Sequence, residues 1–353
     1  MEFWSNLFEL LFTPAFAASV LRITTPILFA ALGGIMARRC GIMILALEGR
    51  MLTAALFAVI GSALTKRAVL GGVSAALADP ALAAKANFVG IIAGFIVGTV
   101  AGVLMALFLA YMAVGLKADA YLAGLAINTM TTGGTVFILY MVAGDKGISS
   151  SLDSGSMPFI DLPIIKDIPV IGEIFSGQNI MTYFSWICVA LVYFILFKTA
   201  TGLRIRAVGE TPSAAESVGV NVKKVQYIAM ALSGLFCGFG GVSLSMSYVQ
   251  FFSRGMTAGK GFIGMSAMNL GNASPVGTAV AAFLFGFFDA MANVMQSMSI
   301  PVQFVQAIPY VATLVGLVVF AIQSENKVKK LKAKQAKEFI PINYTRTKVG
   351  VFF

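Results

Sequence analysis

Long apolar runs alternate with short polar stretches along almost the whole chain, and this pattern is typical of membrane-spanning helices. The nine apolar segments lie at roughly residues 15–37, 41–64, 88–113, 121–143, 182–198, 225–248, 259–272, 276–297 and 303–322. A helix of about 20 apolar residues crosses the ~30 Å hydrocarbon core of a bilayer. We therefore predict an all-α polytopic membrane bundle of about eight to ten spans.

The segment at 259–272 differs from the others because it is short and rich in glycine. A second interruption is expected near Gly49, in the run that begins at Gly41. The bundle should therefore contain one or two discontinuous or re-entrant helices, as in transporters whose broken helices surround a substrate site. A close helix contact is predicted along a stripe of glycines in the third segment, Gly90, Gly94, Gly98 and Gly102.

The overall composition excludes a soluble protein. Of the 353 residues, 58% are hydrophobic and 11% are charged, and the mean hydropathy is +0.89. Soluble domains carry about 25% charged residues. The chain lacks the polar surface that water requires, so its surroundings must be a lipid bilayer.

The chain carries 25 Lys and Arg against 15 Asp and Glu, and the position of this excess points to a membrane surface and not to nucleic acid. Much of it lies in a polar loop at 199–224 and in a tail at 327–353, whereas the loop at 144–180 is acidic. Basic residues beside spans favour the cytoplasm. We predict one transmembrane domain over residues 1–326, with 144–180 outside and the 199–224 loop and the tail inside. Three basic residues oppose this scheme because their loop must be external: Lys66, Arg67 and Lys85.

Catalytic chemistry finds no support in the sequence. Histidine is absent, and the three cysteines lie in or beside apolar segments without ligand spacing, so no metal site, cofactor or catalytic residue is predicted. The stretch from Gly255 to Gly261 looks like a phosphate loop. It has one residue too few between its glycines and no Ser or Thr after Lys260. The chain therefore carries no ATPase of its own, and a membrane-embedded enzyme is disfavoured.

The most distinctive stretch is the polar loop 201–221. Its order of residue types is Gly202-Leu203-Arg204-x-Arg206-Ala207-Val208-Gly209-Glu210, then Pro212, then Ala214-Ala215-x-x-x-Gly219-Val220-Asn221. It resembles the coupling loop of ABC-importer permeases of the nucleoside and simple-sugar group, where the Ala-Ala-x-x-x-Gly turn sits in a groove of the ATPase subunit. The resemblance assigns this coupling role to Arg204, Arg206, Glu210, Ala214, Ala215, Gly219, Val220 and Asn221.

Other motifs extend the resemblance to about half of the chain, over residues 25–60 and 198–320. They are Leu47-Glu48-Gly49, the run from Met256 to Ile263, the turn from Gly271 to Gly277, and the run from Leu284 to Ala290. The first departs from the family because Ile44, Ala46 and Arg50 stand where Asn, Gly and an apolar residue are usual.

The resemblance implies a non-catalytic permease subunit in a bacterial inner or plasma membrane, passing a small molecule. It implies three partners: an ABC ATP-binding subunit, a second permease that we expect to be a different chain, and an extracytoplasmic substrate-binding protein. The long 144–180 loop could dock that binding protein, or it could simply cap the spans.

Ionisable and amide side chains within the spans are candidates for the translocation pathway because burying them in lipid is costly. They are Glu48, Asn128, Asn269, Asp289 and Asn293. Glu48 and Asp289 could equally be structural groups that neighbouring backbone or helices satisfy. On a regular helix Glu48 and Arg50 point to nearly opposite faces, so they would pair only across a break.

Three transport functions fit the sequence. The first is an ATP-driven importer of nucleosides or simple sugars, and the second is a branched-chain amino-acid permease of the same wider family. The third is a secondary transporter driven by protons or sodium, in which Glu48 and Asp289 would be the ion sites. The third leaves the 199–224 loop without a role.

Overall fold

The computed structural model describes residues 13–43, 45–70, 80–161 and 171–297, with isolated helical positions at 311, 314–316, 318 and 322. In this part of the chain, seven helices are long and apolar enough to cross a membrane. They are α2 (Pro14–Arg39), α3 (Leu47–Leu70), α5 (Pro80–Ala110) continued by η1 (Tyr111–Gly115), α6 (Ala120–Ala143), α8 (Ile180–Lys198), α11 (Val222–Val242) continued by η2 (Ser243–Tyr248), and α13 (Pro275–Ser297). The predicted all-α membrane bundle is confirmed.

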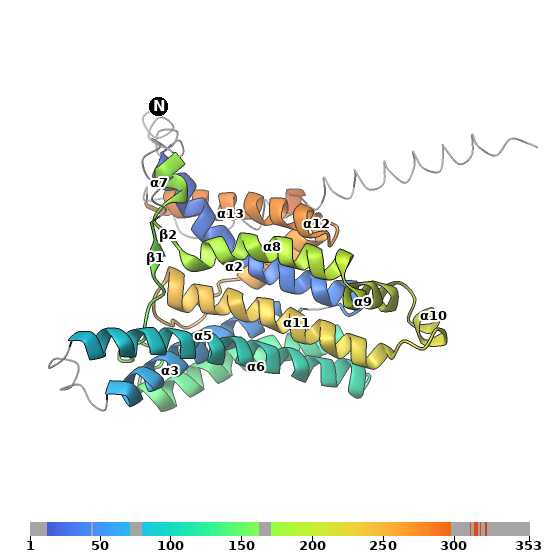
Figure 1. Ribbon diagram of the computed structural model, residues 1–353, viewed down its shortest axis with the longest axis horizontal. Helices are drawn as coiled ribbons and strands as arrows, with labels where there is room; N and C mark the ends of the chain where they lie inside the picture. Colours follow the sequence, from blue (N-terminus) through green and yellow to red (C-terminus); the bar gives the residue numbers. More distant parts are fainter. Residues whose placement is uncertain are drawn as a thin grey trace, which may run out of the picture.

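The shorter elements gather at the two ends of the bundle (Figure 1). One end carries α9 (Ala200–Glu210) and α10 (Pro212–Ser217), and we call it the α9 end. The opposite end carries α7 (Ile171–Phe175) and an antiparallel ribbon of β1 (Phe159–Ile160) and β2 (Gln178–Asn179), and we call it the ribbon end. The predicted 199–224 and 144–180 loops thus lie at opposite ends. The predicted span at 303–322 and the tail at 327–353 fall almost wholly outside the described residues.

The core of the bundle lies around α2, α3 and α11. In the most apolar 18-residue stretch of each of these helices, 78% to 83% is buried, compared with 33–39% for α5, α6 and α8. The outer three helices therefore expose apolar side chains such as Phe108, Phe137 and Phe194, as lipid-facing helices do.

The glycine stripe of α5 faces the core, as the sequence predicted. A Cβ on Gly94 or Gly98 would lie 2.6 or 2.7 Å, respectively, from an atom of Ala58 in α3. One on Gly102 would lie 2.8 Å from Cα of Gly238 in α11. These distances leave no room for a side chain, so the glycines allow α5 to approach both neighbours closely.

One crossing of the bundle is only partly helical. After η2 the chain pairs with Ile148 near the ribbon end, through Ser253, and then runs without regular helix to Gly259. There α12 (Lys260–Leu270) begins and continues to the α9 end. Its 11 residues cover about 16 Å, roughly half a bilayer core. The sequence allows either a discontinuous or a re-entrant helix here. The contacts of Ser253 near the ribbon end and of Asn269 at the α9 end favour a discontinuous crossing.

A second irregular stretch precedes α3. The apolar run begins at Gly41, but the helix begins at Leu47. Gly41 has a φ of 84°, in the left-handed region that favours glycine, so the chain turns sharply there after α2. The break before α3 and the start of α12 lie next to each other, because a Cβ on Gly261 would lie 2.5 Å from the backbone nitrogen of Glu48.

Candidate functional site

The turn after α10 is a tight helix C-cap. Gly219 has a φ of 85°, its N–H donates to the Glu216 carbonyl at 2.9 Å, and the Val220 N–H donates to the Ala215 carbonyl at 3.0 Å. This pair of hydrogen bonds is the Schellman arrangement, which needs a left-handed residue and therefore favours glycine. A Cβ on Gly219 would meet nothing within 4 Å. The turn therefore stands free of the rest of the described chain.

The eight residues assigned to coupling occupy three kinds of position. Ala215 is buried, and Arg206 lies half-buried with its guanidinium 4.9 Å from the centre of the Phe197 ring. Asn221 caps α11, since its side chain accepts from the Lys224 N–H at 3.0 Å. Val220 is half-buried, Asn221 is exposed, and so are the other four: Arg204, Glu210, Ala214 and Gly219. The exposed set is the part that another subunit can contact.

Helix α9 is held tightly against the end of α2. A Cβ on Gly209 would lie 2.1 Å from the Arg39 carbonyl oxygen, so only glycine fits there. Arg39 in turn donates to the Ala273 carbonyl at 3.0 Å, in the turn between α12 and α13. Its neighbour Arg38 donates to the Asn269 side chain at the end of α12. Asn269 therefore helps to join α2 to α12 at the α9 end.

Glu48 joins the two broken helices. Its carboxylate accepts from the Gly259 N–H at 2.9 Å and from the Gly261 N–H at 2.7 Å, at the start of α12. Free N–H groups at a helix start carry partial positive charge and favour a carboxylate. Glu48 itself lies in the first turn of α3. Within the described residues it makes no ion pair with Arg50, which points elsewhere.

Asn128 of α6 holds the break before α3 in place. Its side chain accepts from the Gly49 N–H at 2.8 Å and donates to the Leu45 carbonyl at 2.9 Å. The Gly49 N–H is one of those that a helix start leaves without a preceding carbonyl, and the Leu45 carbonyl lies just before the helix. Asn128 is 8% exposed, so the structure shows it as a brace for the break.

Asp289 of α13 faces a partner that the sequence analysis missed. The Lys260 Nζ lies 3.3 Å from its Oδ2, and each side chain is about 15% exposed. Lys260 is the first residue of α12, next to the groups that Glu48 binds. Asn293, one turn further along α13, is exposed. The sequence shows Lys260 within a failed phosphate loop and within the family-like run from Met256 to Ile263, but nothing local marks it as a partner of a residue 29 positions away.

A second missed residue is Arg50, which is fully buried. Its Nη1 donates to the Ser233 hydroxyl of α11 at 2.9 Å, and the Cys237 thiol lies beside it. Its Nε and Nη2 have no hydrogen-bond partner in the described part of the chain. In the sequence, Arg50 stands out as a departure from the family. Its partner could not be predicted, because nothing distinguishes Ser233 from other serines in apolar helices.

A small polar cavity of about 90 Å³ opens at the ribbon end. Hydroxyl and amide side chains from α2, α8, β2 and η2 line most of it, together with Arg22. Tyr248 lies at its edge, and both Arg22 and Asp289 act electrostatically on the Tyr248 hydroxyl. Polar groups therefore continue from this cavity to the Lys260–Asp289 pair and on to Glu48.

Together, the spanning helices, the discontinuous crossing and the charged groups at its centre define a multi-pass membrane protein with polar and charged groups in its interior. Residues 16–322 match the family model described as the permease component of the branched-chain amino acid transport system. The chain belongs to this permease family. No solved structure matches it significantly.

Several curated relatives are named as ABC transporter permeases. The nucleoside ABC transporter permease protein NupC of Lactococcus lactis is 33% identical over 308 residues, covering 86% of this chain and 91% of NupC. The guanosine ABC transporter permease protein NupQ of Bacillus subtilis is 33% identical, covering 84% of this chain and 88% of NupQ. A second Lactococcus lactis protein, the nucleoside ABC transporter permease protein NupB, is 32% identical over 46% of this chain and 45% of its own length.

We expect Glu48→Ala to destabilise the protein because two backbone N–H groups lose their acceptor. Each unsatisfied N–H costs about 1–3 kcal/mol. Glu48→Gln, which keeps one acceptor oxygen, should fall between Glu48→Ala and the wild type. Thermal unfolding in detergent measures the order, with Glu173→Ala at an exposed position as control. If Glu48→Ala and the wild type unfolded at the same temperature, the hydrogen bonds of Glu48 to the start of α12 would not stabilise the protein.

For Arg50, we expect removal of its partner to be worse than removal of the arginine. Ser233→Ala leaves a buried guanidinium without its hydrogen bond, whereas Arg50→Met replaces it with an apolar side chain of similar length. Unfolding of the two variants in detergent should therefore rank Ser233→Ala below Arg50→Met in stability. The opposite ranking would mean that the arginine makes a favourable interaction beyond Ser233.

Proposed function

We propose that this chain is the membrane permease subunit of an ATP-driven importer of nucleosides or simple sugars. The observation that carries the proposal is the free-standing Gly219 turn, in a chain whose relatives are ABC transporter permeases. The chain is non-catalytic in this proposal, and a separate ATP-binding subunit hydrolyses ATP. The α9 end then lies in the cytoplasm and the ribbon end outside, as the basic and acidic loops indicate.

Movement of the ATPase subunit reaches the spans through direct contacts. The Gly219 turn and α10 are the parts that dock, and α9 directly precedes them in the chain. Gly209 presses α9 against Arg39, and Arg39 holds the turn between α12 and α13. A displacement of α9 therefore shifts the C-terminal end of α12, at Leu270, while Glu48 fixes its N-terminal end.

The translocation pathway follows the polar groups along α12. It begins at the small cavity beside Tyr248, passes the Lys260–Asp289 pair and reaches the broken start of α3. Hydroxyl and amide groups suit a neutral substrate rich in hydroxyl groups, such as a nucleoside. The ion pair compensates its own charges, so it leaves no net charge in the pathway. Asn128 and Asn269 do not contact the substrate in this proposal, but they hold the helices along the route in place through the hydrogen bonds described above.

Two further partners complete the transporter. The chain is similar to both NupC and NupB of one organism, which supports pairing with a second, unlike permease. An extracytoplasmic binding protein would deliver the substrate, and the ribbon, α7 and the described residues from 144 to 161 are the surface at the correct end to receive it.

Gly219→Glu should abolish ATP-dependent uptake and binding of the ATPase subunit while membrane insertion persists. The matched control is Gly144→Glu at the C-cap of α6. Gly144 also has a left-handed φ, 73°, and open space around it, but it lies at the ribbon end. Both variants therefore carry the same backbone strain. We expect a loss of uptake of at least about 10-fold for Gly219→Glu alone, corresponding to about 1.4 kcal/mol of lost coupling.

Uptake in vesicles with ATP supplied on the cytoplasmic side is the measurement. Full uptake by Gly219→Glu, or equal damage by Gly144→Glu, would contradict coupling through this turn. Uptake driven by an ion gradient without ATP would favour a secondary transporter.

Ser247 of η2 lines the small polar cavity, so Ser247→Cys should report substrate there. The three native cysteines are buried, so a membrane-impermeant thiol reagent should label the new thiol selectively. We expect millimolar nucleoside to slow labelling at least about 3-fold, while labelling of Ser151→Cys, exposed at the same end, stays unchanged. Protection by leucine instead would indicate a branched-chain amino-acid permease. No protection by any solute would place the pathway elsewhere.

A further inference from the structure

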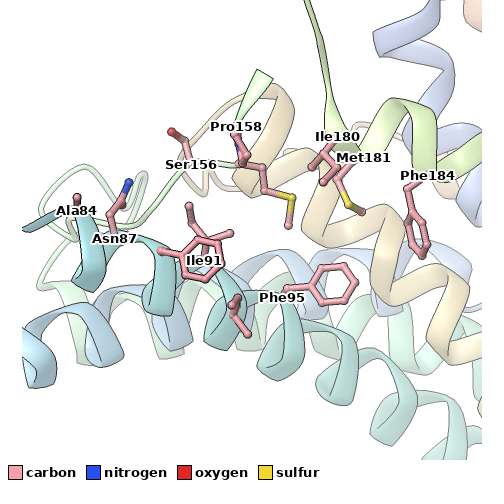
Figure 2. Close-up of a pocket in the computed structure, with 12 residues that line it drawn as sticks. Ala84, Asn87, Ile91, Phe95, Ser156, Pro158, Ile180, Met181 and Phe184 are labelled. Carbon is pink, nitrogen blue, oxygen red and sulfur yellow. The ribbon is translucent and has the colours of Figure 1, made fainter. Parts of the chain in front are cut away.

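An apolar groove of about 700 Å³ runs between α5 and α8 near the ribbon end. Figure 2 shows Ile91 and Phe95 of α5 facing Met181 and Phe184 of α8 across it. Almost all of its lining is carbon and sulfur, and Asn87 and Ser156 contribute polar groups at one end only. The groove is thus a long apolar trough with one polar end.

The other end of the groove is closed by aromatic rings. Phe95 stacks on Phe239 of α11 with 5.3 Å between ring centroids, and Phe184 meets the same ring at 5.2 Å. Phe239 is 8% exposed and also contacts Phe29 and Phe236. These ring contacts join the inner end of the groove to the core of the bundle, so the position of that end is fixed.

The groove lies at the depth of the outer half of the bilayer. The span at Ala81–Gly115 has 35 residues and is about 52 Å long, so about seven residues at each end extend beyond a ~30 Å core. Phe88 to Phe95 then lie among the lipid chains of the leaflet at the ribbon end. Lys85 and Ala84 lie at the level of the lipid headgroups.

Lys85 stands at the polar end of this groove. It is exposed, and it lies three residues before Phe88 and seven before Ile92, on the same face of α5. It makes no ion pair with any residue that the structure describes. By contrast, Lys66, which also opposes the expected charge distribution, is paired with Asp153 at 2.7 Å. An unpaired lysine at headgroup depth attracts a phosphate.

We propose that this groove binds one phospholipid of the leaflet at the ribbon end, with an acyl chain between α5 and α8 and its phosphate beside Lys85. The apolar lining matches an acyl chain, and the exposed basic group at the mouth matches a headgroup phosphate. A nucleoside does not fit, because the polar groups that its hydroxyls and base need are lacking along the trough. The proposal is independent of the transported substrate.

The experiment uses the full chain in vesicles of phosphatidylethanolamine and phosphatidylglycerol, with a phosphatidylglycerol probe that carries a diazirine in its acyl chain. After illumination, mass spectrometry locates the labelled peptides. We expect labelling concentrated on residues 88–95 and 180–184. Millimolar inorganic phosphate should not compete, because the site takes a headgroup and a chain together.

Two matched pairs of variants test the site. Ile92→Trp fills the groove and should reduce labelling there at least about 5-fold, while Ile96→Trp, one turn along the same helix and also exposed, should not. Lys85→Glu should reduce labelling at least about 3-fold by repelling the phosphate. Arg67→Glu should not, because α3 packs against the opposite, glycine face of α5.

Even labelling of all lipid-facing helices, or equal effects of the two tryptophan variants, would overturn the proposal. So would labelling that disappears when the second permease is bound, because the groove would then be a subunit interface. If Ile92→Trp fails to fold, the Lys85 and Arg67 pair still decides the question through the headgroup.

Discussion

One carboxylate holds two interrupted helices together in the middle of this membrane protein. Glu48 lies in the first turn of α3 and accepts two N–H groups at the start of α12. An unpaired carboxylate at this depth would be costly, and so would the unpaired N–H groups of a helix start. Each compensates the other. The place of α12 depends on this contact, and Lys260, the first residue of α12, is thereby placed next to Asp289.

The limits of some spans, although not of α3 and α5, could be predicted from the sequence, because there they follow from apolar length alone. The predicted segments at 121–143 and 276–297 differ from α6 and α13 by one residue at most at each end. The glycine stripe of α5 was also predictable, since a four-residue repeat places its members on one helix face. The Gly219 turn follows from a local motif whose hydrogen bonds close within six residues.

The contacts inside the bundle could not be predicted in the same way because they join distant positions. Asn128 and Asp289 were recognised as costly polar groups, but their partners at Leu45, Gly49 and Lys260 lie on other elements. The start of α3 at Leu47 was missed because the apolar run continues back to Gly41 without a polar signal. Tertiary hydrogen bonds from Asn128 decide where this helix begins.

The helix that follows the Gly219 turn extends without interruption from Val222 through Val242 into η2, which ends at Tyr248. It is a rod of about 40 Å with Asn221 capping one end and the polar cavity beside the other. The rod is clamped near its centre, where Gly234 and Gly238 touch α5 and Gly241 touches α3. It therefore has the geometry of a lever that pivots near its centre, and a small tilt at the α9 end would swing the ribbon end in the opposite direction.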